Sequence, residues 1–229
     1  MSALGVCIGA GMAHTEDGNR QVPYALIVPQ VTVSNRHLFI KEIERWHFDM
    51  NRINRYYDRG HISEQLLDRA YFAAGVIDMV VGSAEIGEYS QLIACNRQGH
   101  ILGVSMYAVG RFFNTTRCYI DVQAVEPMHL RGAPGPVKVR GIGSGLLAAV
   151  ALTALHAGAT ELFLTPLDHD ARVFWLRRGF HEESSSSSGL RVQGIPEIQK
   201  LLGDCLPSRG GDFLICREIT PSQVSSICH

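Results

Sequence analysis

The segment VRGIGSGLLAAVALTALHAGATELFL, residues 139–164, decides the fold. Its glycine-rich start, Gly141 to Gly145, leads into a helix of small apolar residues that ends near Gly158, and Thr160 to Leu164 is then predicted to be a strand. The first turn of a helix leaves its N–H groups unpaired and carries partial positive charge. Glycines at this turn remove the side chains that would keep a phosphate group away. The segment therefore predicts an anion site where the helix begins.

A dinucleotide-binding fold is the main alternative for such a turn. That fold needs the pattern G-x-G-x-x-G directly after a strand. Counted from Gly141 and Gly143, the third glycine should fall at position 146, which is Leu146. The preceding segment, Leu130 to Lys138, is also a glycine- and proline-rich loop rather than a strand. The sequence disfavours the dinucleotide fold on both counts.

Strand and helix patterns alternate on either side of this segment. Upstream, we predict a strand over Tyr24 to Val33 that Pro29 would confine to a sheet edge, and a long helix capped by Ser34 or Asn35 whose apolar stripe faces the core. A shorter helix starting at Ser63 follows. The other predicted elements are a hairpin of Gln91–Cys95 and Ile101–Val109, a strand over Cys118–Val125, a helix over Asp168–Arg178, a loop at Ser184–Ser188, a helix over Ile195–Leu206 and a closing strand over Asp212–Ile219.

Composition excludes several classes of protein. The 229 residues carry a formal net charge of −1, which gives no general affinity for nucleic acid or for an anionic membrane. The six cysteines form no CxxC pair, so we expect no metal site, and they are too sparse for a disulfide scaffold. Met1 to Ala13 has no Lys or Arg before its apolar run, unlike a secretory signal, and no apolar stretch is long enough to span a membrane. We expect a cytoplasmic protein, and the sequence leaves a homodimer open.

Two motifs resemble those of the GNAT superfamily of N-acyltransferases. The first is Val125-x-Pro127 followed by Arg140-x-x-Gly143-x-Gly145, which resembles the acyl-CoA motif after the fourth strand of that family. The second, Asp168-x-x-Ala171-x-x-x-Trp175-x-x-x-Gly179-Phe180, resembles the later motif in which Asn, Ala, Tyr and Gly-Phe hold these positions. The two occur in the family's order, and the resemblance covers roughly residues 91–180 and the closing strand.

The resemblance implies a fold and an activity. The fold is α/β, with a mixed, mostly antiparallel central sheet flanked by helices on both faces. Residues 23–229 would form one acyltransferase domain with its acyl-CoA core at 91–180, and residues 1–22 a flexible arm. The activity would be transfer of an acyl group, acetyl before others, from acyl-CoA to a primary amine by direct attack in a ternary complex, without a metal. The amine acceptor stays unidentified, as a small molecule or a protein.

The resemblance also implies which residues bind coenzyme A. Backbone N–H groups of the glycine turn would hold the pyrophosphate, while Arg131, Lys138 and Arg140 could add charge. The fourth and fifth strands of the family, here Cys118–Val125 and Thr160–Leu164, diverge so that the pantetheine arm can pair with strand backbone. The implied cofactor-binding residues are Val125, Arg140, Gly141, Ile142, Gly143, Ser144, Gly145, Asp168 and Trp175.

The sequence departs from the family pattern in two places. Met128 to Val139 form an insertion between the proline and the arginine, which could be a lid, an acceptor-specificity loop or an inert surface loop. The tyrosine that commonly protonates the leaving thiolate is replaced by Trp175, whose indole N–H is not a usable acid. These departures affect the acceptor and the proton chemistry more than the coenzyme A site.

Candidate catalytic residues lie on the strand Cys118–Val125. Strict alternation would place Tyr119, Asp121 and Gln123 on one face, opposite Ile120, Val122 and Ala124. A primary amine with a pKa of about 10.4 must lose a proton before it attacks. Asp121 is the first candidate for this base and Glu126 the second. Tyr119 is the candidate acid, Cys118 is expected to pack in the core, and His169 to be an exposed loop residue.

Two other functions stay open. The chain could be a catalytically silent acyl-CoA-binding module, because Trp175 replaces the tyrosine. It could also resemble an acyl-homoserine lactone synthase, which shares the fold, although the acidic and arginine pattern of such enzymes is not evident in Arg36 to Asp58.

Overall fold

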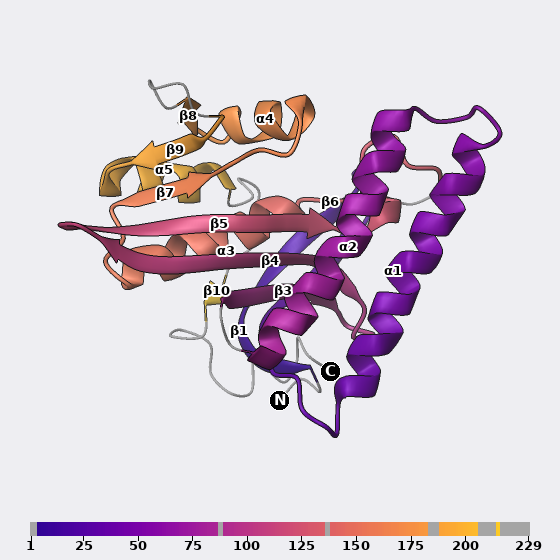
Figure 1. The fold of residues 1–229 in the computed structure, drawn as a ribbon, viewed down its shortest axis with the longest axis horizontal. Coiled ribbons are helices and arrows are strands. Elements are labelled where there is room, and N and C mark those ends of the chain that lie inside the picture. Colours follow the sequence, from indigo (N-terminus) through magenta and orange to yellow (C-terminus); the bar gives the residue numbers. More distant parts are fainter. Residues whose placement is uncertain (1–3, 87–88, 136–137, 183–187, 206–213, 216–229) are drawn as a thin grey trace.

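The computed structural model describes residues 4–86, 89–135, 138–182, 188–205 and 214–215 (Figure 1). Five helices lie among these residues: α1 (Arg36–Tyr57), α2 (Glu64–Ile86), α3 (Ile142–His156), α4 (His169–Leu176) and α5 (Ile195–Cys205), and a 3-10 turn, η1, spans Pro127–His129. The strands are β1 (Gly5–Thr15), β2 (Gln21–Pro29), β3 (Ser90–Asn96), β4 (Ile101–Phe112), β5 (Thr115–Val125), β6 (Val139–Arg140), β7 (Glu161–Leu164), β8 (His181–Glu182), β9 (Leu190–Gln193) and β10 (Leu214–Ile215).

All the strands belong to one sheet. Their order is β10-β1-β2-β3-β4-β5-β7-β9-β8, and the short β6 pairs with the end of β1. The β5–β7 pair is parallel, whereas the other pairs are antiparallel. The predicted fold class, a mixed and mostly antiparallel sheet with helices on both faces, is confirmed.

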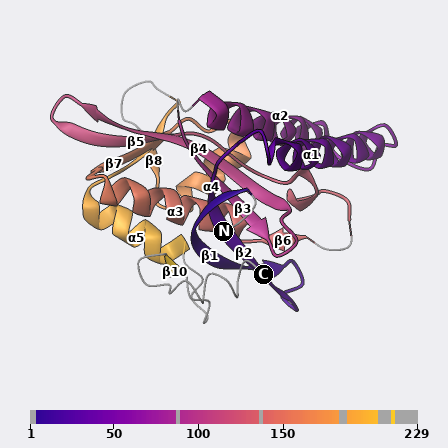
Figure 2. The ribbon, with the colours of Figure 1, turned by 90° about the horizontal axis from the view of Figure 1, so that it is seen from below.

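Helices cover both faces of the sheet (Figure 2), and each face has its own core. On one face lie α1 and α2, and the apolar stripe predicted for α1 is buried there at Phe39, Trp46 and Ile53. On the other face, α3 is apolar all round its circumference because it lies between the sheet and α5. Gly103 of β4 allows this close approach, since a Cβ there would overlap Ile142 of α3.

The N-terminal expectations need correction. Gly5–Thr15, expected within a flexible arm at residues 1–22, form β1, which pairs along its length with β2. The glycines of β1 obscure its period, and Gly11 is small because the Tyr24 ring packs against it. β2 is not an edge strand, because it lies between β1 and β3 in the sheet. Pro29 is compatible with this position because it is the last residue of the strand.

The other predicted elements fall close to their expected positions. The helix from Ser63 is longer than predicted, since α2 continues through Ile86. Of the predicted closing strand, β10 (Leu214–Ile215) is described and pairs with β1, while 212–213 and 216–219 lie outside the described residues. Most of the predicted serine loop, 184–187, also lies outside them.

Candidate functional site

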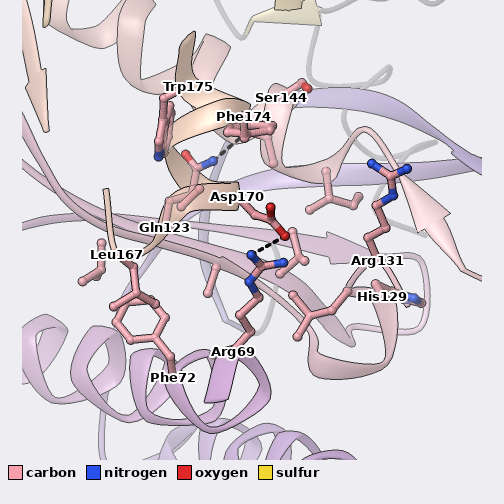
Figure 3. A pocket seen from close by; sticks show the side chains of 18 of the residues that line it. Arg69, Phe72, Gln123, His129, Arg131, Ser144, Leu167, Asp170, Phe174 and Trp175 are labelled. Carbon is pink, nitrogen blue, oxygen red and sulfur yellow. Dashed lines mark hydrogen bonds and ion pairs between the residues drawn. The ribbon is translucent and has the colours of Figure 1, made fainter. Parts of the chain in front are cut away.

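The sheet divides where β5 and β7 diverge. The two strands pair from Arg117 with Glu161 to Ile120 with Leu164. Beyond Ile120, β5 continues to Val125, paired with β4 but no longer with β7. A pocket of about 810 Å³ lies at this divergence. It is lined by residues from α2, from β5, from the η1 loop, from the start of α3 and from α4 (Figure 3). The pocket therefore reaches from the α3 face of the sheet to the face covered by α1 and α2.

The glycine turn forms the α3 end of the pocket. Gly141 has a φ of 100°, a left-handed conformation that favours glycine, and α3 begins at the next residue. Gly143 borders the pocket, and a Cβ on it would find its nearest neighbour, the Gln123 amide, at 3.5 Å. The Gly145 N–H already donates to the Gly141 carbonyl oxygen at 2.9 Å. The donors available at this end are thus those of the first helical turn.

Gln123 connects the strand to this turn. Its side-chain Nε2 donates to the Gly143 carbonyl oxygen at 2.9 Å, and its Oε1 is buried without a hydrogen-bond partner in the described part of the chain. A buried hydrogen-bond acceptor without a partner costs free energy of folding. Gln123 lines the pocket, which a polar ligand could fill. Sequence reasoning placed Gln123 on the polar side of the strand and gave it no role.

The basic residues near the turn are mostly paired. Arg140 donates to Glu16 Oε1 at 2.6 Å and to the His129 carbonyl oxygen at 2.8 Å, and Lys138 lies 3.6 Å from Glu16 Oε2. The Arg140 hydrogen bond holds the pKa of Glu16 below its usual value. Arg131, by contrast, is exposed beside the pocket. An incoming phosphate would therefore compete with Glu16 for Arg140 and Lys138.

A bulge in β5 changes the predicted faces of the strand. Val122 pairs with Met106 and Ile120 pairs with Tyr107, so Asp121 is an extra residue between them. Ile120 consequently packs in the core under α3, whereas Val122 packs in the core under α1 and α2. The prediction that Ile120, Val122 and Ala124 share a face is wrong, and Gln123 does not lie on the face of Tyr119. Strict alternation could not reveal the bulge.

Of the three catalytic candidates, Asp121 lines the pocket. Its side chain is partly exposed at the bulge, where β5 leaves β7. Tyr119 stacks on Phe163 of β7 with ring centroids 5.6 Å apart and is not among the lining residues. The structure thus separates the proposed acid from the pocket and leaves Asp121 beside it.

Glu126 belongs to a buried charge cluster instead. It forms an ion pair with Arg45 of α1, which also donates to Glu42 at 2.7 Å and to the Ile101 carbonyl oxygen at 2.6 Å. Burial raises the pKa of Glu126, against the opposing charge of Arg45. His129 Nε2 lies 3.4 Å from Glu126 Oε2 and does line the pocket. Burial and the Arg45 charge lower the pKa of His129 to about 4, so its ring is neutral near pH 7.

The second motif, in and around α4, also lines the pocket. Asp168 caps α4 by accepting from the Ala171 N–H at 2.7 Å, and it also accepts from Arg69 Nε at 2.7 Å. A second carboxylate, Asp170, lies 2.6 Å from Arg69 Nη2. No sequence signal pointed to Arg69, which comes from α2 and ties that helix to α4 across the pocket (Figure 3).

Trp175 is buried in the core at the position of the family tyrosine. Its ring packs edge-on against Phe174 and Phe180, at centroid distances of 4.9 and 5.4 Å. Both Trp175 and Phe174 line the pocket. His169 is the first residue of α4 rather than a loop residue, and it is exposed and does not line the pocket. Cys118 is fully buried and burial raises its pKa to about 12, which agrees with a packing role.

The insertion is not an inert loop over its described part. Ala133 is 2% exposed and packs with Met50 and Ile53 of α1 and Leu67 of α2, and Leu130 packs against the same cluster. Leu130 and Arg131 also line the pocket. The insertion therefore connects the helix pair to the pocket.

Two negative findings concern the described residues alone. None of the helices in this part of the chain has the length and apolar character required to cross a bilayer. Within the same residues, no three His, Cys, Asp or Glu side chains gather in a way that could hold a metal ion.

Comparison with known proteins gives likenesses of fold. No protein-family model matches the chain, and no curated protein matches it in sequence. Similar solved structures include an AtaT toxin mutant bound to the C-terminus of the antitoxin AtaR, at 20% identity over 56% of this chain and 81% of that one, with a TM-score of 0.44. The same complex with acetyl-CoA matches at 19% identity over 62% and 85% of the two chains, with a TM-score of 0.42. Nourseothricin acetyltransferase matches at 20% identity over 45% and 63%, with a TM-score of 0.34. Each of these matches is a partial likeness at low sequence identity.

Proposed function

We propose that this chain is an acyl-CoA-dependent N-acyltransferase. The observation that carries the proposal is the pocket at the divergence of β5 and β7, which joins a helix start on one face of the sheet to a carboxylate-bearing end on the other. Such a passage lets a phosphate-bearing donor and an amine acceptor approach one reaction point from opposite sides. The predicted motifs coincide with this pocket, since the glycine turn and α4 both line it.

The residues of the pocket fit coenzyme A. The first turn of α3 offers unpaired N–H groups and the positive end of a helix dipole to a pyrophosphate. Gly143 leaves the space that a phosphate needs. Beyond Ile120, β5 has no β7 partner, so its backbone can pair with the amides of a pantetheine arm. The Gln123 Oε1 atom can accept a hydrogen bond from the same arm.

Asp121 is the proposed base for the acceptor proton, and its position in the pocket lining supports this role. The amine nitrogen forms a bond to the thioester carbonyl carbon, and the carbon–sulfur bond breaks. Asp121 accepts the proton that the ammonium group loses before the attack, directly or through water, while strand N–H groups stabilise the charge on the carbonyl oxygen. The second proton leaves the nitrogen for solvent after the carbon–nitrogen bond has formed. The leaving thiolate, with a pKa of about 8.5, takes a proton from solvent and needs no tyrosine. Trp175 at the tyrosine position is then compatible with turnover.

The test combines binding and turnover. Calorimetry should show that acetyl-CoA binds, and Gly143→Asp should abolish binding because a carboxylate would occupy the pyrophosphate position. The variant should stay folded, since a carboxylate near the start of α3 stabilises the helix dipole. Gly203→Asp, at an exposed and open site on α5, is the matched control.

The outcome separates the proposed enzyme from a silent binding module. Unchanged affinity in folded Gly143→Asp would contradict a coenzyme A site at this turn. Tight binding without release of coenzyme A in the presence of any amine would support the silent module instead.

A further inference from the structure

The two ends of the pocket have different linings. The α3 end carries the glycine turn and arginines, as described above. At the other end, which we call the α2-side end, the lining residues come from α2, from the β5 bulge, from the loop between β7 and α4 and from the first turn of α4. They are Arg69, Phe72, Ala73, Asp121, Val122, Leu167, Asp168 and Asp170. If the donor occupies the α3 end, as the proposed function requires, the acceptor occupies this one.

Half of the lining residues of the α2-side end are apolar. The apolar residues are Phe72 and Ala73 from α2, Val122 from β5 and Leu167. The apolar side chain of Leu167 is 56% exposed to solvent. Figure 3 shows Phe72 and Leu167 on the same side of the Arg69–Asp170 ion pair, and His129 and Arg131 on the other side. An exposed leucine and an aromatic ring in one pocket provide surface that an apolar ligand would cover.

The charge of this end is negative. Arg69 is bonded to two carboxylates, Asp168 and Asp170. Burial acts to raise the pKa of Asp168, but the hydrogen bonds from Arg69 and Ala171 outweigh it and lower the pKa, so Asp168 is ionised. Among the described acids of this end, Asp121 is the one that makes no ion pair or hydrogen bond. One unpaired carboxylate matches one ammonium group.

The ion pairs of Arg69 also limit the size of the acceptor. They tie α2 to the first turn of α4, with nitrogen–oxygen distances of 2.7 Å to Asp168 and 2.6 Å to Asp170. The pocket has about 810 Å³ in total, which is the size of a small-molecule site, and part of it must hold the donor. A bulky acceptor would have to break the Arg69 pairs.

We propose, on the basis of the transferase function above, that the acceptor is a small monoamine with an aromatic or branched aliphatic body. Its single ammonium group lies at Asp121 before deprotonation, and its body packs between Phe72, Val122 and Leu167. Polyamines fit less well, because Asp168 and Asp170 already pair with Arg69 and leave Asp121 for one ammonium group. Amino sugars fit less well, because their hydroxyl groups would lose their water against the apolar side chains.

The experiment measures coenzyme A release by the full chain with a fixed concentration of acetyl-CoA. The acceptors are phenethylamine and isoamylamine as apolar monoamines, ethylamine as a truncated monoamine, and glucosamine and spermidine as polar acceptors. A lysine-containing peptide and an aminoacyl-tRNA represent macromolecular amines. We expect kcat/KM for phenethylamine to exceed that for ethylamine by at least about tenfold, since each methylene in an apolar pocket contributes about 10-fold or more.

A variant of Phe72 tests the wall directly. Phe72→Ala should lower kcat/KM for phenethylamine by about tenfold and reduce the preference over ethylamine, while the affinity for acetyl-CoA stays the same. Tyr71→Ala is the matched control, because Tyr71 is the neighbouring exposed residue of α2 and does not line the pocket. Phe72→Leu keeps an apolar wall and should retain most of the preference, which separates lost contact from lost folding.

The outcomes distinguish the acceptor class from the underlying function. A higher kcat/KM for glucosamine, spermidine, the peptide or the tRNA than for phenethylamine overturns the acceptor class and leaves the transferase in place. An unchanged preference in folded Phe72→Ala also overturns it. Failure to bind acetyl-CoA, or binding without transfer to any amine, overturns the transferase function and the acceptor class with it.

Discussion

The hydroxyl of Tyr24 occupies the space that a Cβ atom on Gly145 would need. The ring also lies against Gly11 of β1, so two glycines distant in the sequence accommodate one tyrosine between β1 and α3. Tyr24 is buried, and burial raises its pKa to about 12. Gly145 therefore has a packing role, whereas Gly143, two residues earlier, borders the pocket.

Gly145→Ala should destabilise the protein. The added methyl group overlaps Tyr24, and overpacking of this kind costs about 1–3 kcal/mol. Gly143→Ala, where the nearest neighbour of the new Cβ is at 3.5 Å, should change stability much less. The free energies of unfolding in urea give the comparison. If Tyr24→Leu fails to restore part of the stability of Gly145→Ala, the tyrosine contact is not the cause.

Asp121→Asn should lower the rate of acyl transfer by about 10²- to 10⁴-fold, the usual contribution of a general base. The substitution keeps the shape of the side chain, so affinity for coenzyme A should change little. The limb of the pH–rate profile that reports this proton transfer should disappear in the variant. Asp78→Asn, on the exposed side of α2, is the control. Turnover and a pH profile equal to those of the wild type would make Asp121 a structural carboxylate.

His129 should make stability depend on pH. Its folded pKa of about 4 is below the value of about 6.5 in an unfolded chain, so between these values the unfolded state binds more protons. Stability is therefore lost as the pH falls from about 6.5 to 4, by up to about 3.4 kcal/mol when the shift is converted at 1.36 kcal/mol per unit. Burial raises the pKa of Glu126, so its effect on stability is the opposite: its contribution is lost as the pH rises.

The measurement compares the wild type with His129→Asn by urea unfolding across this range. The variant should lack the part of the pH dependence that belongs to His129, so the difference between the two free energies should change with pH. His37→Gln, at an exposed position on α1, is the control. A constant difference between wild type and His129→Asn would show that this histidine titrates normally.

Local patterns predicted most of the fold. The apolar stripe of α1, the hairpin of β3 and β4 and the glycine turn of α3 each depend on residues close together in the chain. β1 was missed because its glycines serve contacts with distant residues such as Tyr24. The roles predicted for the site residues stay predictions. The turn and Asp121 line the pocket, but the β5 bulge and the Arg69 bridge arise from tertiary contacts that no spacing reveals.

The last prediction concerns Glu16, which holds the basic residues at the phosphate end. Its carboxylate lies 2.6 Å from Arg140 Nη2 and 3.6 Å from Lys138 Nζ, and its side chain is 52% exposed. Glu16→Gln removes the negative charge, so both cations become available to the phosphates of coenzyme A. The Kd for coenzyme A should fall by about 3- to 10-fold at low ionic strength, and salt should reduce the gain because the groups are near the surface.

The control for Glu16 is Glu182→Gln. Glu182 forms a similar surface ion pair, 2.7 Å from Arg172, and neither residue lines the pocket. The variant should therefore leave the affinity unchanged. Calorimetry at two salt concentrations gives both values, and kcat of Glu16→Gln should equal that of the wild type because the reaction point is distant from Glu16. Weaker binding in Glu16→Gln would mean that the carboxylate positions Arg140 for the phosphates rather than competing with them.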